Sequence, residues 1–404
     1  MLSRWERAEP WIAIGAFLAI LGGSVWRRLA MLPRLSFDWD EGVYWQSLES
    51  MRHGHHLFVE VFSSQPPFFL AGIYPLYNLL GGGIVAGRTP VMVGSLVSLV
   101  AIFVIGRSLS GTWSGLAAMA FLAFDPLYLE LSDRLQADLP CVVIGVVAVA
   151  IAAYARSRAT GPGPWVLAGL VIGLSIMTKL LGVVFLVPVA WLAVYSPGAA
   201  RRQVLDVALG LAAAIVLVLL PFAGALGAVY SQAIGLHLGA RVSEPQSMGE
   251  KLKRIVDSYP VVLPALAAAV TCALAARRRV GWVAMLVLWL LVALAADLAQ
   301  GPLFIHHLLV LAPPMALLAG AAPALAVAAL RERQGAAVGA PPWPLAAILV
   351  ASLAVIAGLG LRALTGPMPP ADATTIALSV LILIVPDPSP PVPTTSTASA
   401  PAST

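Results

Sequence analysis

The sequence predicts an all-α polytopic membrane protein with about eleven transmembrane helices, within a range of roughly nine to thirteen. Hydrophobic residues make up 60% of the 404-residue chain and charged residues only 11%. The mean hydropathy of +0.90 is far higher than that of a water-soluble domain, which at this value would have to expose a large apolar surface. Apolar runs of about 20 residues, enough to cross about 30 Å of hydrocarbon, recur along the chain. These runs lack the period-two alternation of barrel strands, so helices must span the membrane.

The expected spans are the apolar runs of the chain, taken in order. They lie at residues 11–27, 88–106, 112–130, 137–155, 164–179, 181–196, 204–226, 259–276, 280–298, 306–328 and 343–362. The first run has no small-residue cleavage site after it, so we interpret it as a retained anchor. The two runs on either side of Lys179 are short, and they fit either two spans or one tilted hairpin.

Basic residues predict that the N-terminus lies in the cytoplasm. Most acids fall in one set of connections, and the alternate connections hold Arg4, Arg7, Arg107, Arg156, Arg158, Arg201, Arg202, Arg277, Arg278, Arg279, Arg331 and Arg333. Cytoplasmic loops of membrane proteins carry such an excess of Lys and Arg. We therefore expect a multi-pass membrane protein whose acidic loops face outward. High Ala, Gly, Arg and Pro with three lysines in all suggests a GC-rich bacterial genome, so the expected membrane is the bacterial inner (plasma) membrane. The net charge of +5 reflects topology, and we expect no nucleic-acid partner, because no basic stripe carries interleaved aromatics.

Two connections on the expected external side are long. They comprise residues 28–87 and 227–258, while every expected cytoplasmic loop is brief. We expect residues 1–362 to form one transmembrane domain. Residues 363–404 should form a short C-terminal remnant and a tail whose Pro, Ser and Thr content is typical of disorder. Any chemistry is therefore expected at the external face.

The first long connection combines acids with aromatic residues. The stretch SFDWDEGVYW contains Asp38, Asp40 and Glu41, and WDEGVYWQSLESMRHG has an amphipathic helical pattern. A second apolar segment follows Pro66 and Pro67 and ends in three glycines. We expect both segments to be helices along the membrane surface, with aromatic residues at headgroup depth. The GGGIVAG run lacks the Lys-Ser/Thr of a phosphate-binding loop, so we interpret it as a loop.

The order of several motifs resembles a known family. The motifs are the Asp-Glu pair after the first span, the Pro-Pro helix start, SDRLQADLP, LSIMTKLLG and HHLLVLAPPMALLAG. Together they are similar to the fold type C glycosyltransferases. The most similar branch, family 39-like, contains dolichyl-phosphate-mannose protein mannosyltransferases and lipid A aminoarabinose transferases. The resemblance covers about residues 8 to 330, and it depends on the order of the motifs rather than on any single one.

The resemblance implies a membrane enzyme that moves a hexosyl or pentosyl group from a polyprenyl-phosphate carrier to a glycan, lipid or protein acceptor on the external face. By position, Asp40 corresponds to the family's catalytic carboxylate, and Glu41 lies beside it. A carboxylate at this place can take the proton of the acceptor hydroxyl as that oxygen attacks the anomeric carbon. One such base is enough for an inverting displacement.

Polar residues near the expected external ends of the spans are the substrate-binding candidates. They are Gln65, Arg88, Arg134, Asp138, Lys179, His237, Arg241 and His306. The cationic members of this set would attract a lipid phosphate. The family pattern is broken before the Pro-Pro pair, where lipid A transferases have an acid and a lysine and this chain has Ser64 and Gln65. The donor phosphate is therefore held elsewhere, or the chain represents a sub-branch with other substrates.

No cofactor is required by these residues, and we expect no metal ligand set, although the sequence leaves a divalent metal open. His306 and His307 are adjacent, and adjacent residues of an α-helix point about 100° apart, so they are poorly placed to share an ion. The histidines of the HGHH stretch, His53, His55 and His56, would bind zinc only adventitiously.

Simpler interpretations stay open for most of these residues. The acids could be solvated interfacial charges, Lys179 could snorkel to the surface, and the KLKR segment at 251–254 fits general headgroup binding. Two other classes of function also remain. A transporter or flippase of lipid-linked saccharide would use intramembrane acids such as Asp125 and Asp297, although no internal repeat is detectable. A non-catalytic scaffold of an envelope-assembly complex would need neither Asp125 nor Asp297.

Overall fold

The computed structural model describes residues 4–33, 38–158, 161–197, 199–243, 245–259 and 280–334. Apart from Tyr259, the expected span at 259–276 lies outside these residues, as do the expected span at 343–362 and the expected tail at 363–404. In the described ranges the regular secondary structure is helical, and an isolated bridge joins Leu57 and Val61.

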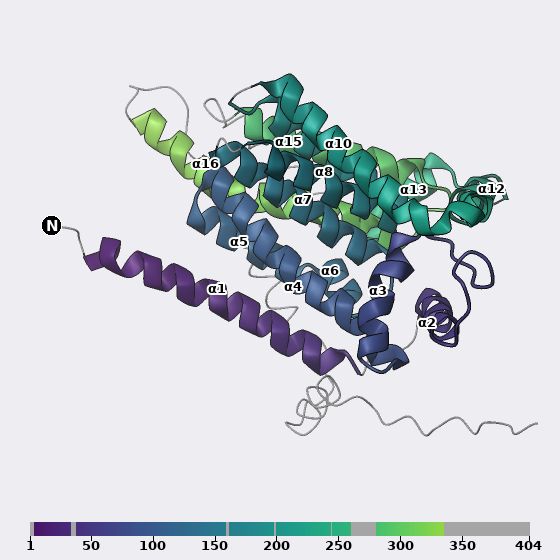
Figure 1. The fold of residues 1–404 in the computed structure, drawn as a ribbon. Coiled ribbons are helices and arrows are strands. Elements are labelled where there is room, and N and C mark those ends of the chain that lie inside the picture. The colour runs from purple at the N-terminus through teal and green to yellow at the C-terminus, as the bar shows by residue number, and fades with distance from the viewer. Residues whose placement is uncertain are drawn as a thin grey trace, which may run out of the picture.

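Long helices run side by side in an elongated bundle (Figure 1). Its first half contains α1 (Arg4–Met31), α2 (Trp39–Arg52), α3 (Phe68–Leu79), α4 (Gly83–Ser110), α5 (Thr112–Phe124), α6 (Pro126–Leu131), α7 (Asp138–Arg158) and α8 (Pro162–Thr178). Its second half contains η1 (Leu180–Phe185), α9 (Leu186–Val194), α10 (Ala200–Leu219), η2 (Leu220–Ala225), α11 (Leu226–Tyr230), η3 (Ser231–Gly235), α12 (Leu236–Ser243), α13 (Met248–Ser258), α15 (Val280–Ala299), η4 (Ile305–Leu311) and α16 (Ala312–Gln334).

The all-α polytopic class is confirmed. Six helical segments of the described chain are long and apolar enough to cross a membrane: Ala8–Met31, Gly83–Ser110, Asp138–Arg158, Ala200–Ala240, Gly281–Ala299 and Ile305–Ala322. Shorter apolar helices lie at Phe68–Leu79, Thr112–Phe124, Pro162–Thr178 and Leu180–Val194. Each expected span within the described residues therefore corresponds to helical structure.

Polar residues mark two breaks between apolar helices, one inside an expected span and one between two expected spans. The run expected at 112–130 is divided at Asp125, whose extended backbone ends α5 and whose carboxylate accepts a hydrogen bond from the Tyr128 amide at 2.9 Å. Pro126 then occupies the first turn of α6, where its missing N–H is not needed. Lys179 likewise has extended backbone between α8 and the 3₁₀ helix η1. The break at Lys179 agrees with the two short runs expected on either side of it, whereas the break at Asp125 lies inside a run that hydropathy treated as one span.

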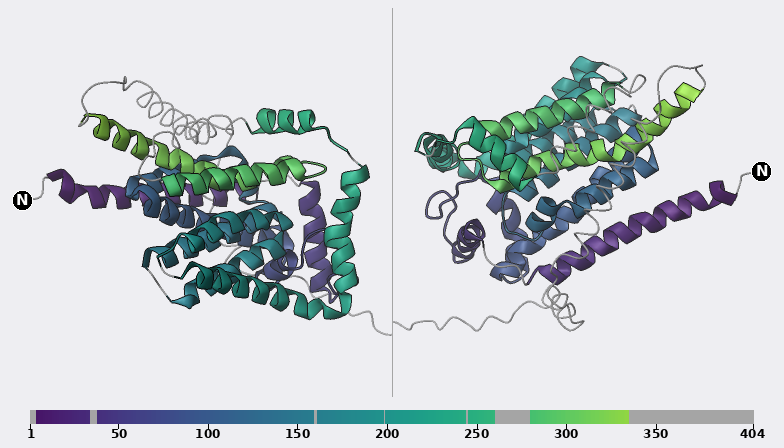
Figure 2. Two further views of the ribbon diagram at one scale, coloured as in Figure 1. Left: turned by 90° about the horizontal axis from the view of Figure 1, so that it is seen from above. Right: turned by 180° about the vertical axis from the view of Figure 1, so that it is seen from behind.

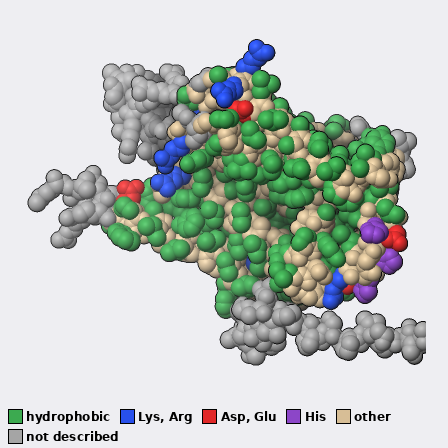
Figure 3. All heavy atoms as spheres, viewed as in Figure 1, with side chains coloured by type: hydrophobic (Ala, Val, Ile, Leu, Met, Phe, Trp, Pro, Cys, Tyr) green, Lys and Arg blue, Asp and Glu red, His purple; other side chains and the backbone are tan. Residues whose placement is uncertain are grey.

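The two ends of the bundle differ in charge. Most of the visible Lys and Arg side chains gather toward the end of the bundle where α10 begins, and histidine side chains gather at the opposite end, beside α2 (Figure 3). Between the two ends the visible surface is mainly hydrophobic. This distribution is the one that a protein crossing a bilayer presents to the two aqueous sides and to the lipid between them.

The two helices expected in the first long connection are present, and α2 lies crosswise to the bundle. Helix α2 and the later helix α12 both run across the same end of the molecule (Figures 1 and 2). Trp39, the first residue of α2, is 86% exposed, as expected for an aromatic side chain at headgroup depth. The end of the bundle opposite the arginines is therefore covered by helices of the connections.

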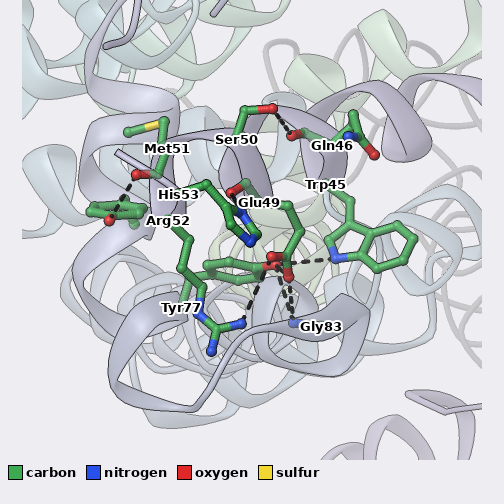
Figure 4. Close-up of polar contacts among 10 residues, drawn as sticks. Trp45, Gln46, Glu49, Ser50, Met51, Arg52, His53, Tyr77 and Gly83 are labelled. Atoms are coloured by element: carbon green, nitrogen blue, oxygen red, sulfur yellow. Dashed lines mark hydrogen bonds and ion pairs between the residues drawn. The ribbon is translucent and has the colours of Figure 1, made fainter. Parts of the chain in front are cut away.

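A polar network fixes α2 against α3 and the start of α4 (Figure 4). The Tyr77 hydroxyl donates to Glu49, and the Gly83 amide reaches the same Glu49 Oε1 at 3.2 Å. Trp45 Nε1 donates to the Tyr77 hydroxyl at 3.1 Å, and Arg52 lies 3.8 Å from the other Glu49 oxygen. An acid at the N-terminus of α4 is also favoured by the helix dipole. These contacts consequently hold α2, α3 and the start of α4 together.

Three consecutive glycines make the turn into α4. Gly81, Gly82 and Gly83 have φ values of 86°, 86° and 82°, a region that L-residues with side chains rarely adopt. A Cβ on Gly82 would also lie 2.6 Å from Arg52 Nη1. The GGG run is therefore a turn that the backbone geometry requires.

Helices α8 and α10 cross at close range through glycines. A Cβ added at Gly210 would lie 1.9 Å from the Val166 carbonyl oxygen. We expect Gly210→Ala to push the two helices apart and to destabilise the protein by about 1–3 kcal/mol. Thermal unfolding in detergent measures this loss. The control is Gly227→Ala in α11, whose new Cβ would meet no atom within 4 Å; equal melting temperatures for the two variants would contradict the expectation.

The second long connection, expected from residue 227, begins as a continuation of α10. Helical structure continues from α10 through η2, α11, η3 and α12, with non-helical φ/ψ of −102° and 16° at Phe222. Pro221 lacks the N–H that would continue the α-helical ladder. The helical pattern resumes after this kink because the following residues contain no further proline before Pro245. His237 is thereby placed on a helix at the end of the bundle covered by α2.

Candidate active site

Asp40 is a half-buried carboxylate in the first turn of α2. The helix dipole favours negative charge at this position. Partial burial raises the pKa of Asp40, the carboxylates of Asp38 and Asp138 raise it further, and His306 and Lys179 act in the opposite direction. Because its pKa is higher in the folded chain than in the unfolded one, the ionised form of Asp40 lowers stability above its ordinary pKa. Ionisable groups whose pKa is shifted by burial and neighbouring charges are candidates for functional sites.

The side chains of α2 face two different surroundings. Asp40, Glu41 and Tyr44 share the face directed into the protein, since residues three and four apart lie on one side of a helix. Trp39, Gly42, Val43, Gln46 and Ser50 line an open cavity of about 640 Å³ together with residues 60–62. Asp40 is not among the lining residues of that cavity. Besides Asp38, its electrostatic neighbours are Asp138 at the start of α7, Lys179 in the break after α8 and His306 in η4.

Glu41 is fully buried, with 0% exposure, and forms an ion pair with Arg88. Arg88 Nε donates to Oε1 at 2.7 Å and Nη2 to Oε2 at 2.6 Å, which is the bidentate geometry of a strong pair. The Leu135 amide also donates to Oε1 at 2.9 Å, and Arg88 Nη1 donates to the Leu32 carbonyl at 2.9 Å. One pair thus joins the end of α1, the start of α2, α4 and the connection before α7.

A second tie holds the start of α2. The Gln136 side chain donates to Asp38 Oδ2, two residues before Asp40. Gln136 itself is buried. Asp40 is therefore flanked by two residues, Asp38 and Glu41, whose carboxylates are engaged with the segment 135–136.

Asp138 and Lys179 form a second buried pair. Lys179 Nζ lies 2.7 Å from Asp138 Oδ1, and both side chains are less than a tenth exposed. Asp138 is the first residue of α7, and Lys179 occupies the break after α8. Snorkelling to the surface therefore does not describe Lys179. Its ammonium is directed to a carboxylate close to Asp40.

His306 and His307 lie in the 3₁₀ helix η4, beside Asp138. Their ring centroids are 4.6 Å apart with an interplanar angle of 86°, and His306 stacks on Phe304. One ligand atom from each histidine and one from Asp138 lie within 4.8 Å of one another. From helix geometry, adjacent histidines are expected to be poorly placed to share an ion, but here the side-chain rotamers bring the two rings close together.

The segment before the Pro-Pro pair is held by α12 and η3. His237 Nε2 lies 2.8 Å from the Ser64 carbonyl oxygen, and the Ser63 amide donates to the Gln232 side chain at 3.1 Å. Gln65 is buried, and its Nε2 donates to the Tyr44 hydroxyl at 3.3 Å. The two residues that replace the family's acid and lysine are therefore built into an internal hydrogen-bonded loop.

Helix α13 supports the segment that leads into the histidines. Lys251 Nζ donates to the Leu298 carbonyl at 2.9 Å and to the Gln300 carbonyl, and Arg254 Nη1 donates to the Leu303 carbonyl at 2.6 Å. General headgroup binding therefore does not account for these two cations. They position the turn between α15 and η4.

The expected site residues thus divide into three groups. Asp40, Asp138, Lys179 and His306 belong to one cluster, to which the structure adds His307. Glu41, Arg88, Gln65 and His237 are engaged in internal contacts near this cluster. Arg134 is 3.7 Å from Glu130 in a partly exposed pair, and Arg241 lies on α12, with a side chain outside the described set. Sequence inspection undervalued His307, whose adjacency to His306 was the available signal.

The arrangement of the spans and of the crosswise helix after the first span defines the class. The chain has the fold of the type C glycosyltransferases, a class of polytopic membrane proteins, as the motif order predicted. A family model described as Dolichyl-phosphate-mannose-protein mannosyltransferase matches residues 64–224. The resemblance stated from the sequence is confirmed. No curated protein sequence matches the chain.

Three solved structures illustrate the likeness. ArnT from Cupriavidus metallidurans, crystallised with undecaprenyl phosphate, is 18% identical, with a TM-score of 0.61 and coverage of 93% of this chain and 75% of that one. The oligosaccharyltransferase AglB from Archaeoglobus fulgidus, in complex with an inhibitory peptide and a dolichol-phosphate, is 14% identical, with a TM-score of 0.58 and coverage of 100% and 62%. Arabinosyltransferase EmbB from Mycobacterium smegmatis is 14% identical, with a TM-score of 0.51 and coverage of 91% and 39%. At these identities the likeness establishes the fold.

Proposed function

We propose that this protein is a membrane glycosyltransferase that takes a sugar from a polyprenyl-phosphate carrier and passes it to an acceptor hydroxyl. The observation that carries the proposal is the half-buried Asp40, which lies within electrostatic range of Lys179, Asp138 and His306 at one end of a fold type C bundle. An acid and a cation held together there supply the two groups that the reaction needs. ArnT with undecaprenyl phosphate and AglB with dolichol-phosphate support the choice of carrier.

Asp40 is the proposed base. Its carboxylate takes the proton of the acceptor hydroxyl while the acceptor oxygen forms a bond to the anomeric carbon. The bond between that carbon and the carrier's phosphate oxygen breaks in the same displacement, which inverts the anomeric configuration. The leaving group departs as a polyprenyl phosphate, whose negative charge is stabilised by a nearby cation, and Lys179 is the proposed cation.

Glu41 is assigned a positioning role under this proposal. Its carboxylate is buried and bonded to Arg88 and to the Leu135 amide, so it is already fully occupied as an acceptor. The adjacent Asp40 is then the carboxylate that can accept a proton from a substrate. Gln65 and His237 contribute through the loop before Pro66, which they hold in place.

We place Asp40 on the external side of a bacterial inner membrane. Most of the visible Lys and Arg side chains gather toward the other end of the bundle (Figure 3), and cytoplasmic connections are enriched in such residues. A reporter fused after Gln334 in α16 and cysteine labelling at Trp39→Cys test this orientation, since an external α2 would react with an impermeant reagent.

The proposed function is tested by sugar transfer in proteoliposomes. The native chain is incubated with a panel of radiolabelled polyprenyl-phosphate sugars and with lipid, glycan and peptide acceptors. Transfer from at least one donor supports the proposal. If no donor is consumed while the protein moves lipid-linked saccharide between leaflets, the transporter hypothesis replaces the proposed transferase function. If neither activity is found but the protein purifies with an active transferase, the scaffold hypothesis replaces the proposed transferase function.

The pH dependence of transfer should report the raised pKa of Asp40. Activity requires the ionised carboxylate, so the rate falls as pH drops through the pKa of Asp40 in the free enzyme. Burial is the main cause of the upward shift, and the acidic limb should therefore lie above the ordinary aspartate value of about 3.9. The rate constant kcat/KM measured from about pH 3 to pH 8 checks this. An acidic limb at the ordinary value would contradict the assignment.

A further inference from the structure

We propose that Asp138, His306 and His307 form a binding site for a divalent first-row transition metal of the zinc type. The three residues come from two elements, because Asp138 begins α7 and the histidines lie in the first turn of η4. Helices α7 and η4 pack against each other. The site is therefore built across the bundle and is not a feature of a single flexible loop.

The ligand atoms are close enough to share one ion. They lie within 4.8 Å of one another, and ligands of a tetrahedral zinc at about 2.0–2.1 Å from the ion are roughly 3.4 Å apart. Small rotations of the side chains close the remaining gap. Two imidazole nitrogens and one carboxylate oxygen leave a fourth position open, which is the donor set of an open zinc site.

The local geometry permits adjacent histidines to act together. Phe304 has extended backbone, and η4 begins directly after it as a 3₁₀ helix. The side-chain rotamers bring the two imidazoles edge to face, with centroids 4.6 Å apart. The Phe304 amide is 3.4 Å from His307 Nδ1; this distance exceeds that of a strong hydrogen bond, so the contact can be given up when the ring binds a metal.

An unpartnered buried acid supplies independent support. Asp297 in α15 is fully buried, and neither of its carboxylate oxygens has a hydrogen-bond partner among the residues that the structure describes. It lies within electrostatic range of Asp138 and Lys179. A buried carboxylate without a partner is strongly unfavourable. A divalent cation between the histidines would bring positive charge close to this unpartnered acid.

Lys179 is the group that competes with the metal. Its ammonium is bonded to Asp138 Oδ1 at 2.7 Å, so a metal must use the other oxygen or displace the lysine. A positive charge at that distance also lowers metal affinity. Removing it while keeping the side chain's bulk should therefore tighten metal binding, whereas loss of a structural contact alone would not.

The test is a Co²⁺ titration of the full-length, metal-stripped protein in detergent, followed by visible absorption. The native chain should bind a single equivalent with the absorption bands of a cobalt–imidazole complex. The variant His306→Ala/His307→Ala should lose these bands, and Lys179→Met should show a dissociation constant lowered by at least about tenfold. The control His53→Ala/His55→Ala/His56→Ala removes the exposed histidines and should retain the bands.

Two outcomes would overturn the proposal. Bands that persist in the His306/His307 variant, or that disappear in the His53/His55/His56 control, would mean adventitious binding only. No saturable band in the native chain would exclude the site directly. Melting temperatures show whether each variant is folded, and Asp138→Asn provides a second variant if the histidine pair is needed for folding. The absorption readout does not depend on sugar transfer, so failure of the proposed function leaves this test intact.

Discussion

Replacing Asp40 with asparagine is expected to slow sugar transfer by about 10²–10⁴-fold, with the fold and donor binding retained. Asparagine has nearly the same shape as aspartate, but it cannot take a proton from the acceptor hydroxyl. Because ionised Asp40 is unfavourable in the folded state, the variant should melt at an equal or higher temperature at neutral pH. Single-turnover transfer in proteoliposomes, donor binding and thermal melting measure the three quantities.

The matched control is Glu60→Gln. Glu60 belongs to the same connection and is exposed, and its carboxylate accepts a hydrogen bond from the His56 amide at 2.9 Å. Removing its charge should leave transfer unchanged. The assignment of Asp40 as the base fails if the asparagine variant transfers sugar at the native rate, or if it loses donor binding to the same extent as transfer.

Breaking the buried pair between Glu41 and Arg88 should have the largest effect on stability. In Arg88→Met the Glu41 carboxylate stays buried with one backbone amide as its remaining donor among the contacts described above. Loss of one partner of a buried ion pair costs about 3–5 kcal/mol. Chemical unfolding in detergent should therefore show a much lower midpoint, and transfer should fall in parallel because α2 loses its anchor.

The double variant Glu41→Leu/Arg88→Met separates charge from packing. Replacing both partners by apolar residues of similar volume is often close to neutral, so it should recover much of the stability lost in Arg88→Met. Glu130→Gln gives the baseline for an exposed pair, because Glu130 is 59% exposed and 3.7 Å from Arg134; the expected loss is about 1 kcal/mol or less. A double variant less stable than Arg88→Met would contradict this interpretation of the pair.

Hydropathy predicted the spanning helices well because membrane burial acts on each segment separately. The runs at 11–27 and 88–106 became α1 and α4, since a helix in lipid has to satisfy its own backbone groups whatever its neighbours are. The pair of surface helices after the first span was also predictable, from the Pro-Pro start and the glycine run. Their crosswise direction was suggested by their aromatic residues.

The contacts of the site were not predictable in the same way. Glu41 and Arg88 are 47 residues apart, and Arg88 appeared as a phosphate-binding candidate because a single arginine near a span carries no information about its partner. Asp138, Lys179 and the histidines meet only through the packing of α7, the break after α8 and η4. The histidine pair was judged from helix angles alone, and local sequence does not show the side-chain rotamers that bring the two rings close together.

The continuous helical segment Ala200–Ala240 has a consequence for how substrates arrive. Its 41 residues would extend about 60 Å, twice the thickness of the hydrocarbon layer at about 30 Å. The part beyond the kink at Phe222 therefore lies across the end of the bundle instead of crossing the bilayer, as α2 does. With both helices covering that end, a lipid-borne donor would reach Asp40 by lateral diffusion within its leaflet. The turnover rate would then follow the mole fraction of donor in the membrane, and adding inert lipid at constant total donor would slow the enzyme by surface dilution.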